Sequence, residues 1–302
     1  MRSAIRRISN YDPASMAIDY QKLKNWPFKP IEHAYSAKDS ILYALGLGFG
    51  ADPTDRRQLD FVYEEGLKAL PTMAVVLAYP GFWLKDPATG VDWKKVLHGE
   101  QGLKIHEPLP AAGTVTGVTR IDALVDKGAG KGALLYSTRE IRDKSSGKLL
   151  AEVSGCGFLR GDGGFGGPAT ATPKPHAIPE RAPDSSTEIR TLPQAALIYR
   201  LSGDFNPLHA DPEVARAGGF EKPILHGLCT YGVAGHALLK LACDYDPARL
   251  KRMDVRFSAP VYPGETIRTE LWREGDGRFA FRSLVTERNV VVLNNGYAEL
   301  RA

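Results

Sequence analysis

The chain has 302 residues, of which 43% are hydrophobic and 25% are charged, and its formal net charge is +4. This composition is typical of a globular protein, and the length is enough for one large domain or two ordinary ones. No apolar run is long enough to span a membrane. The small positive charge is too weak to indicate nucleic-acid binding, although it suits a ligand that carries phosphates.

Three cysteines, Cys156, Cys229 and Cys243, are an odd number and form no C-x-x-C pair. They predict neither a disulfide framework nor a zinc site, so we expect no metal and a reducing compartment. The first twenty residues contain arginines but lack the apolar core of a signal peptide, and the C-terminal ELRA is not a peroxisomal address. We therefore expect a cytoplasmic protein.

The first half of the chain contains a helical segment followed by strands. Residues 36–50 (SAKDSILYALGLGFG) come first, and residues 73–79 (MAVVLAY) form a short apolar run. Three segments rich in β-forming residues follow, separated by turns: 114–124, 132–143 and 149–159.

Residues 161–186 are dense in glycine, proline, alanine and threonine and cannot build a core of their own. They predict a linker between an N-terminal domain, 1–160, and a C-terminal domain, 187–302. The linker contains a literal G-x-G-x-x-G that begins at Gly161. A proline-rich tail follows where a dinucleotide-binding fold needs a helix, so we reject dinucleotide binding.

The second half begins with a helical segment, 193–201, that ends at a Ser-Gly pair. Asp204 follows directly, and Pro207 then makes the chain turn because it lacks an N–H and disfavours helix in the preceding residue. In such a turn Asp204 and His209, a carboxylate and an imidazole five residues apart, are free to converge on one point. Taken alone, each also has a structural explanation, as a turn former or as a histidine of the surface or core.

A buried helix is expected after Gly227, because residues 228–242 are apolar on most sides and include Gly232 and Gly235. Its N-terminus leaves N–H groups unpaired and carries a partial positive charge, which suits an oxygen that gains negative charge. Four strand segments complete the second half: 252–258, 266–274, 278–288 and 290–300.

The two halves share an internal repeat, in which Tyr43 aligns with Tyr199, 156 residues later. A helix comes first in each half, and a meander of strands comes afterwards. The first half keeps this order but lacks the reactive side chains of the second. In the shared register Gly48 takes the place of Asp204, Gly50 that of Asn206 and Pro53 that of His209.

The stretch Y-R-L-S-G-D-F-N-P-L-H, followed by G-G-F-x-K-P-I-L-H-G-L, closely resembles the hydratase 2 signature of the MaoC-like (R)-specific enoyl-CoA hydratases. The resemblance implies a hotdog fold, in which an antiparallel sheet wraps a long helix, and hydration of trans-2-enoyl-CoA to (R)-3-hydroxyacyl-CoA. With the repeat, we expect an α+β double hotdog. The family's catalytic Asp and His fall on Asp204 and His209, its supporting Asn on Asn206 and its oxyanion-hole glycine on Gly227.

The resemblance implies an enoyl-CoA substrate and no cofactor, and we expect a homodimer. The degenerate first half should accommodate the acyl chain, and we place Gly48 and Lys222 among the substrate-binding residues. His226, His98 and His106 are interpreted as structural. Other hotdog proteins leave two alternatives, an acyl-CoA thioesterase and a non-catalytic acyl-CoA-binding module. The acyl chain length, the pathway and the identity of the base within the Asp204–His209 pair stay open.

Overall fold

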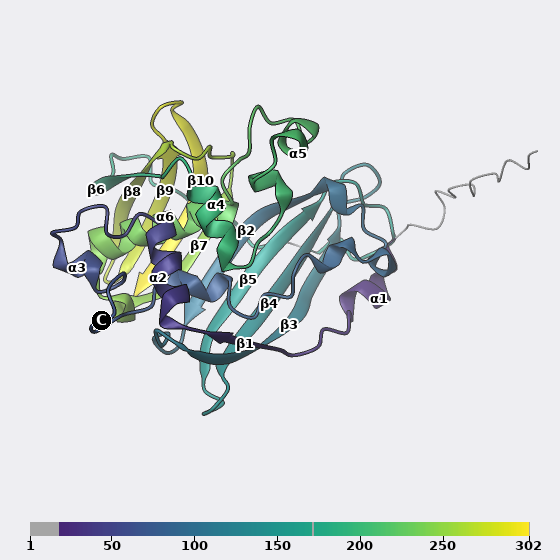
Figure 1. The fold of residues 1–302 in the computed structure, drawn as a ribbon. Coiled ribbons are helices and arrows are strands. Elements are labelled where there is room, and N and C mark those ends of the chain that lie inside the picture. The colour runs from purple at the N-terminus through teal and green to yellow at the C-terminus, as the bar shows by residue number, and fades with distance from the viewer. Residues whose placement is uncertain (1–17, 171, 302) are drawn as a thin grey trace, which may run out of the picture.

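The computed structural model describes residues 18–170 and 172–301. These residues form one ten-stranded antiparallel sheet that carries its helices on one face (Figure 1). The strand order is β1-β3-β4-β5-β2-β7-β10-β9-β8-β6. This arrangement confirms the expected α+β double hotdog. Most of the N-terminal stretch that bears on targeting lies outside the described residues.

The sequence predicts seven of the ten strands and misses β1, β2 and β6. The strands of the N-terminal half are β1 (Ile31–Tyr35), β2 (Val96–Ile105), β3 (Gly113–Asp126), β4 (Ala133–Asp143) and β5 (Leu149–Leu159). Those of the C-terminal half are β6 (Ser185–Arg190), β7 (Leu250–Phe257), β8 (Thr266–Gly275), β9 (Arg278–Val285) and β10 (Val290–Leu300). Because β6 pairs with β8, the C-terminal half of the sheet begins inside the segment expected to be linker.

Six α-helices lie on or beside this sheet, with short turns of 3-10 helix between them in the described part of the chain. The helices are α1 (Tyr20–Lys24), α2 (Ala37–Gly46), α3 (Arg56–Leu59), α4 (Ala195–Tyr199), α5 (Pro212–Ala217) and α6 (Gly227–Ala242). The 3-10 turns are η2 (Pro71–Val75), η3 (Trp83–Lys85), η4 (Pro87–Thr89), η5 (Trp93–Lys95), η6 (Arg200–Ser202), η7 (Pro207–His209) and η8 (Pro247–Arg249).

The internal repeat is visible in the topology of the sheet. The N-terminal half has the order β1-β3-β4-β5-β2, and the C-terminal half, read from its own edge, has the matching order β6-β8-β9-β10-β7. The two halves join through antiparallel pairing of β2 with β7, in which Gly102 lies opposite Asp254. Strands β2 and β7 are therefore the places in the sheet where residues of one half lie directly beside residues of the other.

Among the described residues of the N-terminal half, helix α6 has no counterpart of similar length. Its residues from Cys229 to Leu239 are buried, and two of its glycines allow close approach of the N-terminal half. A Cβ at Gly232 would lie 2.7 Å from Leu47 Cδ2, and one at Gly235 would lie 2.5 Å from Thr72 Cγ2. Thr72 belongs to η2, and the apolar run of residues 73–79 forms only the end of this five-residue 3-10 helix and the turn after it.

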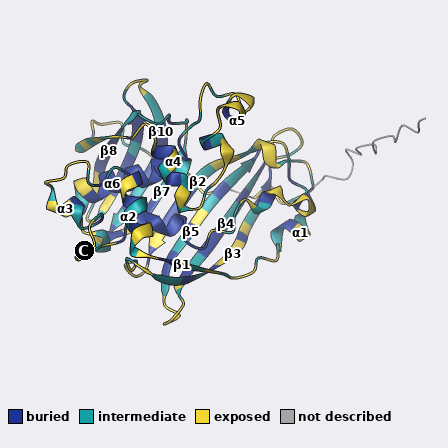
Figure 2. Ribbon diagram, viewed as in Figure 1, coloured by how far each residue is buried: buried dark blue, intermediate teal, exposed yellow. Residues whose placement is uncertain are grey.

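Two hydrophobic clusters lie on the helix-bearing face of the sheet, and Figure 2 shows the burial of their residues. The larger cluster joins α6 and η2 to strands of both halves, whereas the smaller packs Leu23 of α1 and Leu84 against the N-terminal half. Side chains alternate along a strand, so Leu135 of the smaller cluster and Ile141 of the larger share one face of β4. Ser137, between them on that face, is only half-buried.

The glycine-rich start of the linker binds a carboxylate of the chain itself. Asp126, at the end of β3, accepts hydrogen bonds from the backbone N–H groups of Gly128 (2.8 Å), Gly164 (2.7 Å) and Gly166 (2.9 Å). Together these bonds lower the pKa of Asp126 against the effect of its burial. The G-x-G-x-x-G motif therefore has a structural use as a turn around Asp126.

Candidate active site

Two short helical turns place Asp204 and His209. Helix α4 continues into η6 and ends at Gly203, whose φ of +114° is unfavourable for residues with a side chain. Asp204 follows, and its Oδ1 accepts a hydrogen bond from the backbone N–H of Asn206 at 3.2 Å. Pro207 then begins η7, for which Pro supplies a suitable φ. The chain reverses between the two residues and returns His209 to the neighbourhood of Asp204.

The imidazole of His209 is buried and fixed by one backbone carbonyl. Its Nδ1 lies 2.8 Å from the carbonyl oxygen of Ile224. A carbonyl oxygen only accepts hydrogen bonds, so Nδ1 carries the proton and Nε2 of the neutral ring has a free lone pair. Burial is the main cause that lowers the pKa of His209, and it outweighs the opposing effect of Asp204. Neutral His209 therefore presents a proton acceptor at Nε2.

His226 contacts both members of this pair. Its ring stacks on that of His209 with 3.7 Å between centroids, and its Nε2 donates to the backbone carbonyl of Asp204 at 3.1 Å. One side-chain N or O atom of each of Asp204, His209 and His226 lies within 4.8 Å of the others. A single water molecule spans this separation, because two hydrogen bonds of about 2.8 Å reach further.

The same three side chains offer a donor set of two imidazoles and one carboxylate, a combination that Zn²⁺ accepts. In each ring one nitrogen donates to a backbone carbonyl, which leaves the other nitrogen with a free lone pair. Burial and the neighbouring His209 lower the pKa of His226, so both rings are neutral near pH 7. We assign the arrangement to proton transfer, which needs the carboxylate and one free ring nitrogen.

Gly227 is the first residue of α6, so its N–H has no partner inside the helix. A Cβ at this position would lie 3.2 Å from Cε1 of Phe257, at the end of β7. Glycine leaves the start of the helix open in front of that ring. The Gly227 N–H and the positive end of α6 therefore form a donor site for an oxygen that gains negative charge.

Asn206 takes a more local part than the sequence suggests. Its side chain is exposed, and its Oδ1 accepts a hydrogen bond from the Leu208 N–H at 3.2 Å, which caps η7. Its backbone N–H holds the Asp204 carboxylate. The structure thus shows Asn206 shaping the turn that brings Asp204 and His209 together, while its Nδ2 stays available to a ligand.

Two further residues of the N-terminal half belong to this neighbourhood. The ring of His98, on β2, lies 4.6 Å from that of Phe257. Tyr79 is 41% exposed, and the Arg139 guanidinium lies 5.6 Å from its ring centre. The negative charge of Asp204 contributes to raising the pKa of Tyr79, after burial, and acts on that of His98. Sequence spacing gave no signal for either residue, since sheet pairing brings His98 here and Tyr79 lies in the loop after η2.

The two expected substrate-binding residues are not placed beside the dyad by the contacts of the described chain. Gly48 has a φ of +84°, and a Cβ there would lie 3.2 Å from Ile189 of β6. This positive φ alone explains why a glycine occupies position 48. Lys222 is exposed in the loop before α6, with Nζ 5.3 Å from the ring centre of Tyr262. The substrate-binding roles of Gly48 and Lys222 stay predictions.

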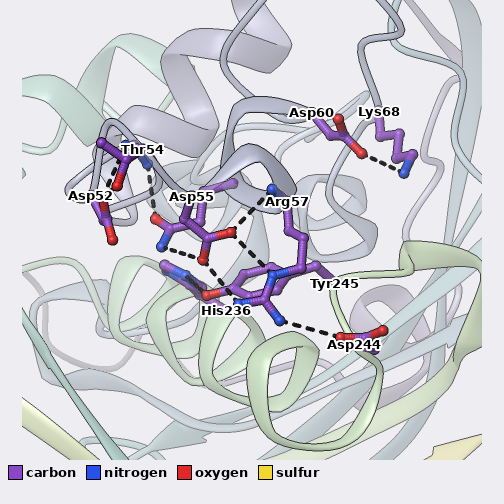
Figure 3. A network of polar contacts seen from close by, with 11 residues as sticks. Asp52, Thr54, Asp55, Arg57, Asp60, Lys68, His236, Asp244 and Tyr245 are labelled. Carbon is purple, nitrogen blue, oxygen red and sulfur yellow. Dashed lines mark hydrogen bonds and ion pairs between the residues drawn. The ribbon is translucent and has the colours of Figure 1, made fainter.

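The first-half segment that aligns with the dyad carries a network of polar contacts (Figure 3). Arg57 pairs with Asp55 at 3.1 Å and with Asp244, just beyond α6, at 3.3 Å. His236 of α6 stacks on Phe49 at 3.7 Å, and burial lowers its pKa to about 4. These contacts hold the segment against α6. The aligned positions themselves are two glycines and a proline, which cannot transfer a proton.

A cavity of about 730 Å³ lies on the opposite face of the sheet, between the linker and the β2–β7 junction. Its lining includes the ion pair of Arg256 with Glu100 and that of Arg252 with Asp254. These charges are already paired within the chain. The cavity is separated from Asp204 and His209 by the sheet, so we exclude it from the site.

Comparison with protein families matches both halves of the chain. Residues 33–161 match the MFE-2 hydratase 2 N-terminal domain, and residues 174–295 match the MaoC-like domain. Among solved structures, a MaoC-like dehydratase from Phytophthora capsici superposes with a TM-score of 0.82 and 38% identity, covering 93% of this chain and 98% of the other. Peroxisomal multifunctional enzyme type 2 from Drosophila melanogaster gives a TM-score of 0.78 and 36% identity, covering 93% of this chain and 50% of that one.

Full-length relatives show the same family. A probable enoyl-CoA hydratase 2 from Dictyostelium discoideum is 43% identical over 293 residues, which cover 94% of this chain and 97% of the relative. A 3-hydroxyacyl-thioester dehydratase Y from Mycobacterium tuberculosis is 41% identical, covering 90% of this chain and 94% of the relative. With both of its halves matched and its relatives aligned along most of their length, the chain belongs to the hydratase 2 family of MaoC-like proteins.

Proposed function

We propose that the protein catalyses the reversible, (R)-specific hydration of trans-2-enoyl-CoA to (R)-3-hydroxyacyl-CoA in fatty acyl-CoA metabolism. The main observation in support of this proposal is that the Asp204 carboxylate and the His209 imidazole lie within 4.8 Å of one another. The names of its relatives, enoyl-CoA hydratase 2 and 3-hydroxyacyl-thioester dehydratase, support the same reaction class.

In this mechanism one water molecule lies between Asp204 and His209. Both groups accept hydrogen bonds from it, His209 through Nε2 and Asp204 through its carboxylate. As the water oxygen bonds to C3 of the substrate, one of the two takes a proton from it. A proton is delivered to C2, so that one molecule of water is added in total. Asn206 holds the Asp204 carboxylate in place through its backbone N–H.

The substrate's thioester oxygen gains negative charge as C3 is attacked, because electrons move from the double bond toward the carbonyl. The N–H of Gly227 is the donor we assign to that oxygen. A preorganised donor at a helix start is worth more in such a site than in water, and removal of one typically costs about a hundredfold or more in rate.

The N-terminal half offers a place for the acyl chain. Between the two hydrophobic clusters, the helix-bearing face of β4 and β5 carries Ser137, Gly155 and Gly157, which are small and half-buried. Residues on this face alternate with those of the outer face. We place the chain across these positions, and we propose one active site for each chain because the first half has Gly48 and Pro53 where the second has Asp204 and His209.

A panel of enoyl-CoA esters, with chiral analysis of the product, tests this function. We expect loss of the double bond without release of free coenzyme A, and an (R)-3-hydroxy product. Release of a free thiol would instead show an acyl-CoA thioesterase, and binding without either change would show an acyl-CoA-binding module.

We further propose that the protein is a cytoplasmic homodimer. Four apolar side chains of α2, α4, η6 and the loop after η6 support an interface, since each is more than 40% exposed: Leu45, Leu197, Leu201 and Phe205. Light scattering of the purified protein checks the dimer, and a mass of one chain would contradict it. In the described residues, no helix has both the length and the apolar character to cross a membrane.

A further inference from the structure

We propose that His98 sets the acyl-chain selectivity of this site, forming the wall that the N-terminal half places beside the chain just beyond the reacting carbons. This inference rests on the proposed function, because it requires the substrate's thioester at Gly227. It assigns a binding role to a residue that the sequence interprets as structural.

A single aromatic ring, that of Phe257, lies between His98 and the start of α6. Gly227 faces Phe257, whose Cε1 lies 3.2 Å from the position that a Cβ would occupy. The ring of Phe257 in turn lies 4.6 Å from that of His98, with 49° between the two planes. A chain that leaves Gly227 along Phe257 and enters the N-terminal half therefore meets His98.

The surroundings of His98 place it at an open space and not in the core. Protein atoms surround the ring closely enough to lower its pKa to about 4, yet its side chain stays exposed to solvent. Exposure and a crowded environment coincide when a side chain lines a concave surface. The ring is neutral near pH 7, so an apolar chain passing it does not have to desolvate a charge.

The strand beside His98 provides the space for such a chain. Gly157 of β5 is the sheet partner of His98, and Gly155 lies two positions away on the same face. A Cβ at Gly157 would meet no atom closer than 3.9 Å, and one at Gly155 would lie 3.8 Å from His98 Nε2. The imidazole therefore borders two positions where β5 contributes no side chain. These positions lie on the same face of the sheet as Ser137, between the two hydrophobic clusters.

The deciding experiment compares kcat/KM for crotonyl-CoA and trans-2-decenoyl-CoA in His98→Trp and in a matched control. The control is Leu97→Trp, because Leu97 precedes His98 on the opposite face of β2 and is 45% exposed. We expect His98→Trp to lower the value for decenoyl-CoA about tenfold or more relative to crotonyl-CoA, the scale of steric discrimination in apolar pockets. Leu97→Trp should leave the ratio unchanged.

An equal change for both substrates, or an equal effect of the two Trp variants, would overturn the role of His98. If His98→Trp does not fold, His98→Ala should shift the ratio toward decenoyl-CoA, and an unchanged ratio would again overturn it. Calorimetric binding of decanoyl-CoA and butyryl-CoA keeps this inference separate from the proposed function. Selective loss of decanoyl-CoA binding in His98→Trp would support it even if the wild type hydrates no enoyl-CoA.

Discussion

His226 holds both partners of the catalytic pair, stacking on the ring of His209 at 3.7 Å and donating from Nε2 to the Asp204 carbonyl at 3.1 Å. His226→Phe would keep an aromatic ring against His209 but lose this donor. We expect kcat to fall about tenfold, the effect of one ordinary hydrogen bond, with KM changed less. An unchanged kcat would contradict a positioning role for His226.

Removing either member of the pair should abolish most of the reaction. We expect Asp204→Asn and His209→Ala each to lower hydration of crotonyl-CoA by on the order of a hundredfold or more, the usual worth of a general acid–base group. Circular dichroism checks that the variants keep the fold. Turnover near the wild-type level in either variant would refute the assignment.

Two substitutions of Gly227, by Pro and by Ala, separate the role of its N–H from the role of its small size. Pro is tolerated at the first position of a helix, so Gly227→Pro should remove the donor while α6 persists. Gly227→Ala keeps the donor and only crowds Phe257, from which its Cβ would lie 3.2 Å. We therefore expect a larger loss of kcat from Pro than from Ala. Equal losses would indicate that packing is the only function of this glycine.

The pH dependence of activity should reflect the burial of His209. Its pKa is lowered from the ordinary 6.5, mainly by burial, so Nε2 stays unprotonated to a lower pH than in an exposed histidine. We expect the plot of kcat/KM against pH to remain flat through 6.5 and to fall only below it. A midpoint of the acid limb above 6.5 would contradict a buried, neutral His209 as the proton acceptor.

Stability should also decrease in acid because of His236. Its pKa is about 4 in the folded chain and 6.5 ordinarily, so between these values the unfolded chain binds a proton that the folded chain does not. The free energy of unfolding should therefore fall as the pH drops from 6.5 to about 4, by up to about 3 kcal/mol from this group. His236→Asn, which keeps a donor for the Leu47 carbonyl, should reduce this slope in urea titrations.

The sequence predicted the parts of the site that depend on local spacing. A helix end, a proline turn and a helix start follow one another between Ala195 and Gly227, so local spacing allows Asp204 and His209 to converge, while the family resemblance implies their catalytic role. The repeat likewise predicted the two halves of the sheet, because the later strands of each half are rich in β-forming residues. For Gly48 the structure shows a conformational need for glycine, which the register of the internal repeat does not reveal.

The sequence could not predict the contribution of the N-terminal half. Strand β2 reads VLHGEQGLKI, and its two glycines and charged residues obscure a strand that lies in the middle of the sheet. Without β2, nothing pairs His98 with Gly157 or brings its ring to Phe257. The sequence interprets His226 as structural but does not place it against His209, since their stacking depends on how α6 docks against η7.

The central claim, that Asp204 and His209 add water to C3 of an enoyl-CoA, is tested most directly by hydration in water enriched in a heavy oxygen isotope. Mass spectrometry of the product should locate the label in the 3-hydroxyl group for the wild type. The double variant Asp204→Asn, His209→Ala should incorporate no label, because the positions of the N-terminal half that align with Asp204, Asn206 and His209 are two glycines and a proline. Label in a released carboxylate, or label at C3 from the double variant, would contradict the claim.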